Sequence, residues 1–168
     1  ISWRGRYEFI RVAAVLLIVA GIGFGVYKVL LPRKIPSVVL TSGDQIQEVM
    51  LPDSTTVVLN RNSKLSYAFS DNKRRVELKG EAFFDLAADA SRPFEVMASG
   101  VVIRDIGTSF NVNAPEGNDS MIVQVSSGEI EMTSLSNHSI VLKKGEEALY
   151  IKSRDEFIKS AVADTNVI

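Results

Sequence analysis

The chain has 168 residues, contains no cysteine and carries a formal net charge of −1. This length suits one domain plus a short extra segment. The absence of cysteine excludes a disulfide framework, a thiolate metal site and a cysteine nucleophile. Because the chain begins at Ile1 and ends at Ile168, we expect it to be part of a longer protein.

Charge is distributed unevenly along the chain. Residues 1–34 contain six basic residues and one acidic residue, whereas residues 35–168 contain 13 basic and 19 acidic residues. Basic flanks around an apolar stretch are typical of a membrane segment. The acidic remainder argues against nucleic acid as a partner, since phosphate binding requires a basic surface.

An apolar segment near the N-terminus predicts one transmembrane helix. Residues 12–27 carry no charge, and the apolar run continues past Lys28 to residue 31. Twenty helical residues reach about 30 Å, the thickness of a hydrocarbon core. A cleaved signal peptide and a buried soluble helix are the alternatives, and the lack of a small-residue cleavage site disfavours the signal peptide. Positions that represent the anchor are Val12, Leu17, Gly21, Gly25 and Tyr27.

The orientation and packing of this segment are less clearly encoded. Three basic residues precede it and three lie at its end or just after it, so the positive-inside rule gives a near tie. The acidic remainder of the chain tips the prediction towards a cytoplasmic N-terminus. Gly21 and Gly25 have the spacing of a helix-dimerisation motif, but glycine is common in membrane helices generally.

From residue 35 onward the sequence predicts an all-β domain. Apolar and polar residues alternate in short runs such as Arg75-Val76-Glu77-Leu78, which is typical of strands with one buried face. Turn signals, including Lys79-Gly80, recur every eight to twelve residues, and no stretch after residue 31 shows a helical period. This rhythm predicts about twelve short, mostly antiparallel strands in a sandwich, a barrel or an irregular β-stack.

Four glycines in this domain are each followed by an acidic residue. We interpret each glycine as a hairpin turn or bulge with positive φ, after which the acidic residue opens the next strand. A Ca²⁺ site is the alternative, but each turn offers one carboxylate where Ca²⁺ requires six to eight oxygens. The four pairs are Gly43-Asp44, Gly80-Glu81, Gly128-Glu129 and Gly145-Glu146.

The sequence predicts a non-enzymatic protein with no catalytic residue, metal ion or cofactor. His138 is the only histidine and lies in a polar hairpin loop, so it cannot form a zinc site alone. A Ser-His-Asp triad is not excluded by counting, although no Gly-x-Ser-x-Gly motif is present. Carboxylates that share strand faces fit a solvated outer face better than a glycosidase pair; they are Glu81 with Asp85, and Glu129 with Glu131.

Aromatic and basic residues suggest two further features of the domain. Phe83 and Phe84 are adjacent, so they cannot both face one core. The basic doublet Arg74-Arg75 is expected at a hairpin tip or strand start, where a role in docking a partner is an option. The candidates for the aromatic core are Phe69, Phe83, Phe94 and Phe110.

Six ordered segments of the domain resemble the FecR family of transmembrane sigma-factor regulators. They are residues 51–60 (LPDSTTVVLN), 63–67 (SKLSY), 75–86 (RVELKGEAFFDL), 92–96 (RPFEV), 106–112 (IGTSFNV) and 123–130 (VQVSSGEI). The resemblance spans about residues 38–151 and continues in the preceding anchor. Thr55 departs from the family pattern, and we expect this to alter one turn only. The motif positions are Asp53, Leu59, Gly80, Glu81, Phe83, Phe84, Pro93, Phe94, Gly107, Thr108, Phe110 and Gly128.

The resemblance implies a division of the chain into five parts. They are a cytoplasmic juxtamembrane remnant at 1–11, the transmembrane helix at 12–31, a linker at 32–37, a periplasmic β domain at 38–155, and a last strand with the approach to a missing C-terminal module at 156–168. The implied location is the inner membrane, with one crossing and a cytoplasmic N-terminus.

The resemblance also implies a signalling function without bond chemistry. FecR-like proteins hold an extracytoplasmic-function (ECF) sigma factor through a cytoplasmic segment, which is nearly absent from this chain. Their periplasmic part receives a signal from the signalling domain of an outer-membrane TonB-dependent transporter. A membrane-tethered periplasmic module that binds glycan or peptidoglycan is the alternative. A glycan site would be expected to have exposed aromatic residues, but the only tryptophan, Trp3, precedes the anchor, so the β domain contains none.

Overall fold

The computed structural model describes residues 17, 21, 37–70, 73–105 and 107–162. These residues form thirteen β-strands, which confirms the predicted all-β class and adds one strand to the expected number. The strands are β1 (Val38–Thr41), β2 (Gln47–Met50), β3 (Thr56–Leu59), β4 (Lys64–Ser70), β5 (Lys73–Asp85), β6 (Phe94–Ala98), β7 (Val101–Asp105), β8 (Ser109–Ala114), β9 (Ser120–Ser127), β10 (Glu129–Ser134), β11 (Ser139–Lys143), β12 (Glu146–Ile151) and β13 (Glu156–Ala161).

The chain divides into two compact units, Ile1–Lys34 and Ile35–Ile168. Of the first unit, only Leu17 and Gly21 are described, and both are helical. Among the described residues, no helix has the length and apolar character needed to cross a membrane. Apart from these two positions, the predicted span at 12–31 lies outside the described residues.

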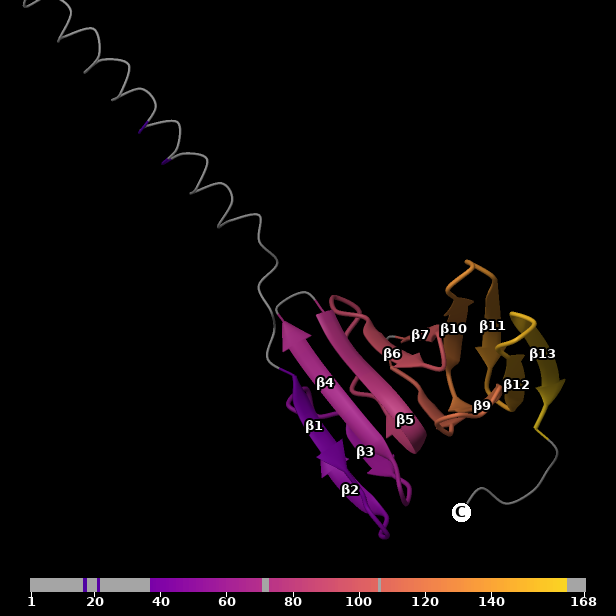
Figure 1. Ribbon diagram of the computed structural model, residues 1–168, viewed down its shortest axis with the longest axis horizontal. Helices are drawn as coiled ribbons and strands as arrows, with labels where there is room; N and C mark the ends of the chain where they lie inside the picture. The colour runs from indigo at the N-terminus through magenta and orange to yellow at the C-terminus, as the bar shows by residue number, and fades with distance from the viewer. Residues whose placement is uncertain (1–16, 18–20, 22–36, 71–72, 106, 163–168) are drawn as a thin grey trace, which may run out of the picture. The chain divides into compact units, whose positions relative to one another are not determined.

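The strands of the second unit form two sheets that share β5 (Figure 1). Sheet A has the order β1-β4-β5-β6-β7-β10-β11. Sheet B has the order β2-β3-β5-β8-β9-β12-β13. Neighbouring strands are antiparallel, with the exception of the parallel pair β5 and β6. The first half of β5 pairs in sheet A and the second half in sheet B, so β5 joins the two layers of a β-sandwich.

Gly80 marks the point at which β5 passes from one sheet to the other. The predicted turn at Lys79-Gly80 was wrong, because residues 73–85 form one continuous strand. Gly80 has a φ of 100°, and a Cβ atom at this position would lie 2.4 Å from Ser63 Oγ. Glycine inside a strand is expected where another part of the chain approaches this closely. Gly43, Gly128 and Gly145 lie between strands, as predicted. Glu129 and Glu146 open the next strands, whereas Asp44 does not, because β2 begins at Gln47.

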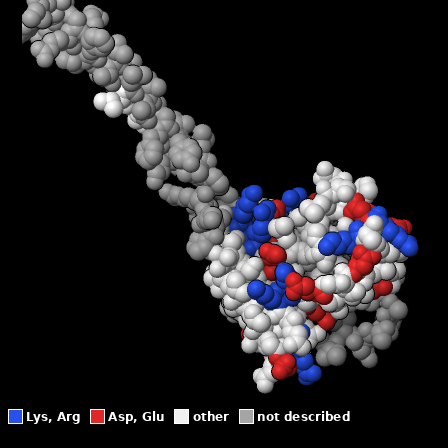
Figure 2. All heavy atoms as spheres, viewed as in Figure 1, with Lys and Arg blue, Asp and Glu red and all other residues white. Residues whose placement is uncertain are grey.

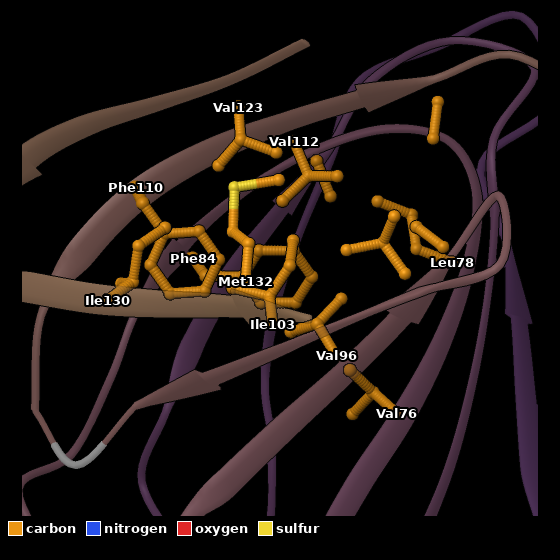
Figure 3. Close-up of a cluster of buried hydrophobic side chains, with 14 of the residues drawn as sticks. Val76, Leu78, Phe84, Val96, Ile103, Phe110, Val112, Val123, Ile130 and Met132 are labelled. Atoms are coloured by element: carbon orange, nitrogen blue, oxygen red, sulfur yellow. The ribbon is translucent and has the colours of Figure 1, made fainter. Parts of the chain in front are cut away.

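The apolar core lies between the two sheets. Figure 3 shows Phe84, Phe110, Val112 and Val123 of sheet B meeting side chains of sheet A, among them Val96. The described buried apolar residues begin at Leu51 and end at Tyr150. Each fully buried large apolar side chain contributes roughly 1.5–3 kcal/mol relative to an exposed one, so this interior is the main source of stability.

The outer face of sheet A carries a ladder of alternating charges. Glu95 accepts hydrogen bonds from Arg75 at 2.7 Å and from Arg104 at 3.1 Å. Arg104 also lies 3.9 Å from Glu131, on the next strand. Burial alone raises the pKa of Glu95, but the two arginines together hold it below its usual value. Figure 2 shows the basic and acidic side chains intermixed on the viewed face of the molecule.

Candidate functional site

Asp53 and Arg74 form a buried ion pair that links two parts of the domain. Arg74 Nη1 lies 2.9 Å from Asp53 Oδ2, and the two side chains are 0% and 4% exposed. Asp53 also accepts hydrogen bonds from the backbone nitrogen and the hydroxyl of Thr55, at 3.1 and 2.9 Å. One carboxylate therefore closes the turn between β2 and β3 and attaches it to β5.

Arg74 also holds the long connection between β5 and β6. Its Nε donates to Arg92 O at 2.7 Å, its Nη1 donates to Ala87 O at 2.9 Å, and its guanidinium carbon lies 5.4 Å from the ring centre of Phe94. The predicted strand start at Arg74-Arg75 is confirmed. A docking role for Arg74 was wrong, because this side chain faces the interior and only Arg75 faces outward.

Three motif phenylalanines pack beside this ion pair. Phe84 stacks on Phe110 with ring centres 5.3 Å apart, and its ring centre lies 6.2 Å from that of Phe94 across the sandwich. The choice of Phe83 for the aromatic core was wrong. Even-numbered residues of β5 face inward, so Phe84 is fully buried while Phe83 lies half-buried on the outer face of sheet B. Phe69 packs against the edge of the core.

A second set of motif residues forms the corner between β7 and β8. Asp105 Oδ2 accepts hydrogen bonds from Gly107 N at 3.0 Å, Thr108 N at 2.7 Å and the hydroxyl of Thr108. Thr108 O accepts a hydrogen bond from Leu86 N at 3.0 Å. A Cβ atom on Gly128 would lie 2.2 Å from the Thr108 methyl group, so this corner requires glycine there. Sequence reasoning did not single out Asp105.

The remaining predicted positions occupy different environments. Leu59 is buried, and Pro93 directly precedes β6. Glu81 faces outward from β5, where its carboxylate accepts hydrogen bonds from Asn60 at 2.8 Å and from Asn111 at 3.0 Å. Leu17 is 74% exposed, and the other anchor positions except Gly21 lie outside the described residues: Val12, Gly25 and Tyr27.

Lys79 lies at the junction of three neighbouring grooves at one end of the sandwich. The largest has a volume of about 610 Å³ and is lined by the β8–β9 loop and the β12–β13 turn. The second borders Arg61 and Gly80, and the third borders Val39 near the β1 edge. These grooves combine segments that are far apart in sequence and offer cations and backbone groups to a ligand or a protein segment.

An exposed ion pair crosses this junction. Lys79 Nζ lies 2.6 Å from Glu116 Oε1, and the side chains are 48% and 72% exposed. The hydrogen bond between them raises the pKa of Lys79 and lowers that of Glu116. An exposed pair of this kind exchanges readily with other charged partners, since it contributes little stability.

His138 does not form a catalytic triad with the groups around it. Its Nδ1 lies 2.9 Å from Asp155 Oδ2, and its side chain is 66% exposed. Hydrogen bonds from Ser134 and then from Tyr150 and Ser136 hold the pKa of Asp155 below its usual value, against the effect of burial. Among the described residues, no hydrogen bond joins a serine hydroxyl to the His138 imidazole, as a catalytic triad would require. Within the described ranges, no three His, Asp or Glu side chains converge as metal ligands.

Comparison with protein families places these motifs in a known group. The family described as FecR protein matches residues 37–131, which is more than half of the chain. The chain belongs to the FecR family. The FecR match begins just before β1 and ends inside β10, so it contains the Asp53–Arg74 pair, the aromatic stack and the Thr108 corner. Strands β11 to β13 lie beyond it.

Two crystal structures are similar to this FecR-family chain. Both are of a candidate anti-sigma factor from Parabacteroides distasonis ATCC 8503, at 2.50 and 1.65 Å resolution. The first is 29% identical, has a TM-score of 0.70, and matches 75% of this chain and 60% of its own. The second is 29% identical, has a TM-score of 0.69, and matches 74% and 59%. The chain thus spans about three fifths of these solved proteins. Among curated proteins, none matches the chain.

Proposed function

We propose that this FecR-family protein regulates a sigma factor and acts through binding, without bond chemistry of its own. The observation that carries the proposal is the FecR match over residues 37–131, together with the similarity to a candidate anti-sigma factor over 75% of the chain. In this proposal the sigma factor belongs to the ECF class. It is held by a segment of the protein on the cytoplasmic side of the membrane.

The proposal includes an inner-membrane location. The uncharged residues 12–27 and their basic flanks support a single crossing, with residues 38–155 in the periplasm. Fusion of alkaline phosphatase after residue 168 tests this, because the enzyme folds into its active form only in the periplasm. High phosphatase activity is expected. Phosphatase activity that is recovered in the soluble fraction and not in the membrane fraction would argue for a cleaved signal peptide.

The proposal further assigns the periplasmic signal to the signalling domain of an outer-membrane TonB-dependent transporter. The grooves around Lys79 support this assignment, because they offer a protein segment an open surface with exchangeable charges. Disulfide cross-linking from Glu116→Cys to single cysteines in the transporter domain tests it. Cross-links are expected at the groove and not from Val141→Cys on the outer face of sheet A. The reverse pattern would contradict the assignment.

Affinity purification of the full-length protein in mild detergent tests sigma-factor binding directly. Recovery of an ECF sigma factor is expected, and it should be lost when the protein begins at Ile35. That shorter chain keeps the whole described β domain and is therefore a matched control. If no sigma factor is recovered under any inducing condition, the proposed function fails.

A further inference from the structure

The outer face of sheet B carries a row of apolar side chains that no described segment covers. Ile122, Leu149 and Ile158 are cross-strand neighbours on β9, β12 and β13. Ile122 is 41% exposed and Ile158 is 44% exposed. With strands about 4.8 Å apart, the row is roughly 10 Å long. Covering it would remove apolar surface from water and so favour association.

A carboxylate lies beside this row without a cation. Glu147 is two residues before Leu149 on β12 and therefore shares its face of the sheet. Glu147 Oε2 accepts a hydrogen bond from Gln124 Nε2 at 2.9 Å, and Oε1 accepts one from Ser160 Oγ at 3.0 Å. Both donors are neutral, so they orient the carboxylate and leave its charge uncompensated.

A second carboxylate is held in the same way two strands beyond Ile122. Glu81 on β5 is in register with Asn113, which pairs in turn with Ile122. Its carboxylate is oriented by the amides of Asn60 and Asn111. Glu147 is in register with Phe83, two residues from Glu81, so the two acids are separated by three strand spacings and by about 7 Å along the strands, or about 16 Å in all.

The two outer faces of the sandwich differ in whether their acidic side chains are paired with Lys or Arg. On sheet A, Glu95 is paired with two arginines. On sheet B, the outward positions of the described strands contain no Lys or Arg. No described Lys or Arg pairs with Glu81 or Glu147 either. Sheet B therefore presents its apolar row beside Glu147, which no described cation pairs, and near Glu81, whose groove also contains Arg61, Lys64 and Lys79.

We propose that the outer face of sheet B docks a protein segment that combines apolar side chains with Lys or Arg. The apolar side chains would cover Ile122, Leu149 and Ile158, and the cations would meet Glu81 and Glu147. A neutral apolar segment would desolvate both carboxylates without pairing them, and an acidic one would be repelled. The inference does not depend on sigma-factor binding, because it concerns a separate surface.

Fluorescence anisotropy with two labelled probe peptides tests the proposal. One peptide alternates leucine with lysine over twelve residues, and the other alternates leucine with glutamate. The full chain is used in non-ionic detergent, with detergent alone as the blank. We expect the lysine peptide to bind and the glutamate peptide not to bind. The double variant Glu81→Gln/Glu147→Gln and the single variant Ile158→Ser should each weaken binding by about tenfold.

A matched variant on the opposite face serves as the control. Glu131→Gln with Val141→Ser removes one carboxylate and one exposed apolar side chain from sheet A and should leave binding unchanged. Cooperative unfolding of each variant shows that it is folded, and Ile158 lies on an edge strand where substitution is mild. Equal binding of both peptides, equal weakening by the control, or no binding would each overturn the proposal. So would self-association of the chain that the double variant abolishes, since the occupant would then be a second copy.

Discussion

Arg74 and Arg75 are neighbours in sequence, yet Arg74 forms a buried ion pair and Arg75 forms one at the surface. Arg74 and Asp53 are buried, whereas Arg75 is 48% exposed and pairs with Glu95 at the surface. Arg74→Met leaves the Asp53 carboxylate buried without its cation, so we expect a loss of about 3–5 kcal/mol in the free energy of unfolding. Arg75→Met should cost about 1 kcal/mol or less. Urea unfolding of both variants measures the difference, and equal losses would contradict the buried pair.

The contact between Gly128 and Thr108 gives a second prediction at a single residue. Gly128→Ala adds a Cβ 2.2 Å from the Thr108 methyl group and places alanine at a φ of 73°. We expect a loss of about 2–4 kcal/mol from the clash and the unfavourable φ together. Thr108→Ser removes the methyl group and keeps the hydroxyl for Asp105. It should therefore recover part of the loss in a double-mutant cycle.

Gly145 supplies the control for this cycle. It has a φ of 79°, but a Cβ there would have no atom within 4 Å. Gly145→Ala should cost only about 1–2 kcal/mol, from backbone conformation alone. Thermal or urea unfolding compares the two alanine variants. If Thr108→Ser gave Gly128→Ala no recovery, the loss would arise from φ and not from the contact.

At the scale of elements, β5 shows what the sequence could and could not reveal. Strand alternation was readable in Val76 and Leu78, and it continues through Gly80 to Ala82 and Phe84. Extending that alternation back from Val76 places Arg74 inside, and extending it forward across Gly80 places Phe84 inside. Glycine was instead assigned to a turn, because glycine is most common in turns. The close approach of Ser63 that requires it depends on a segment 17 residues away, which local patterns do not encode.

The β12–β13 hairpin carries a pH-dependent part of the stability. Burial and then the hydrogen bond to Asp155 raise the pKa of Tyr150 to about 12. An unfolded tyrosine has a pKa of about 10, so the folded state keeps the neutral phenol at higher pH. The corresponding stability is present below pH 10 and is lost as the pH rises to about 12. A shift of about two units amounts to roughly 2–3 kcal/mol.

Tyr150→Phe tests this effect, because phenylalanine keeps the packing against Phe157 at 4.8 Å and removes the hydroxyl. Ultraviolet titration of the folded protein should show one tyrosine ionising near pH 12, and the variant should lack that step. Between pH 10 and 12 the variant should lose less unfolding free energy than the parent chain. If both chains lost the same amount, Tyr150 would not be the group responsible.

At the scale of the whole molecule, the grooves at Lys79 and the apolar row on sheet B depend more on which strands pair, and in which register, than on the local sequence pattern. The all-β class and most turns follow from alternation and glycine placement, which act over a few residues. The largest groove at Lys79 joins four separate segments, and the apolar row on sheet B joins three strands. A single sequence carries no signal for which strands become neighbours across such distances, so neither surface could be predicted from it.

The described fold also predicts that the β domain is stable without the first unit. Every described buried apolar residue lies between Leu51 and Tyr150, and both sheets are complete within residues 38–161. A chain beginning at Ile35 should therefore unfold cooperatively in urea with the same midpoint as the full chain in non-ionic detergent. The comparison uses near-ultraviolet circular dichroism, which reports on the packing of the buried aromatic residues. A lower midpoint or a non-cooperative transition would mean that residues 1–34 contribute to the stability of the sandwich, and they would then be more than a tether.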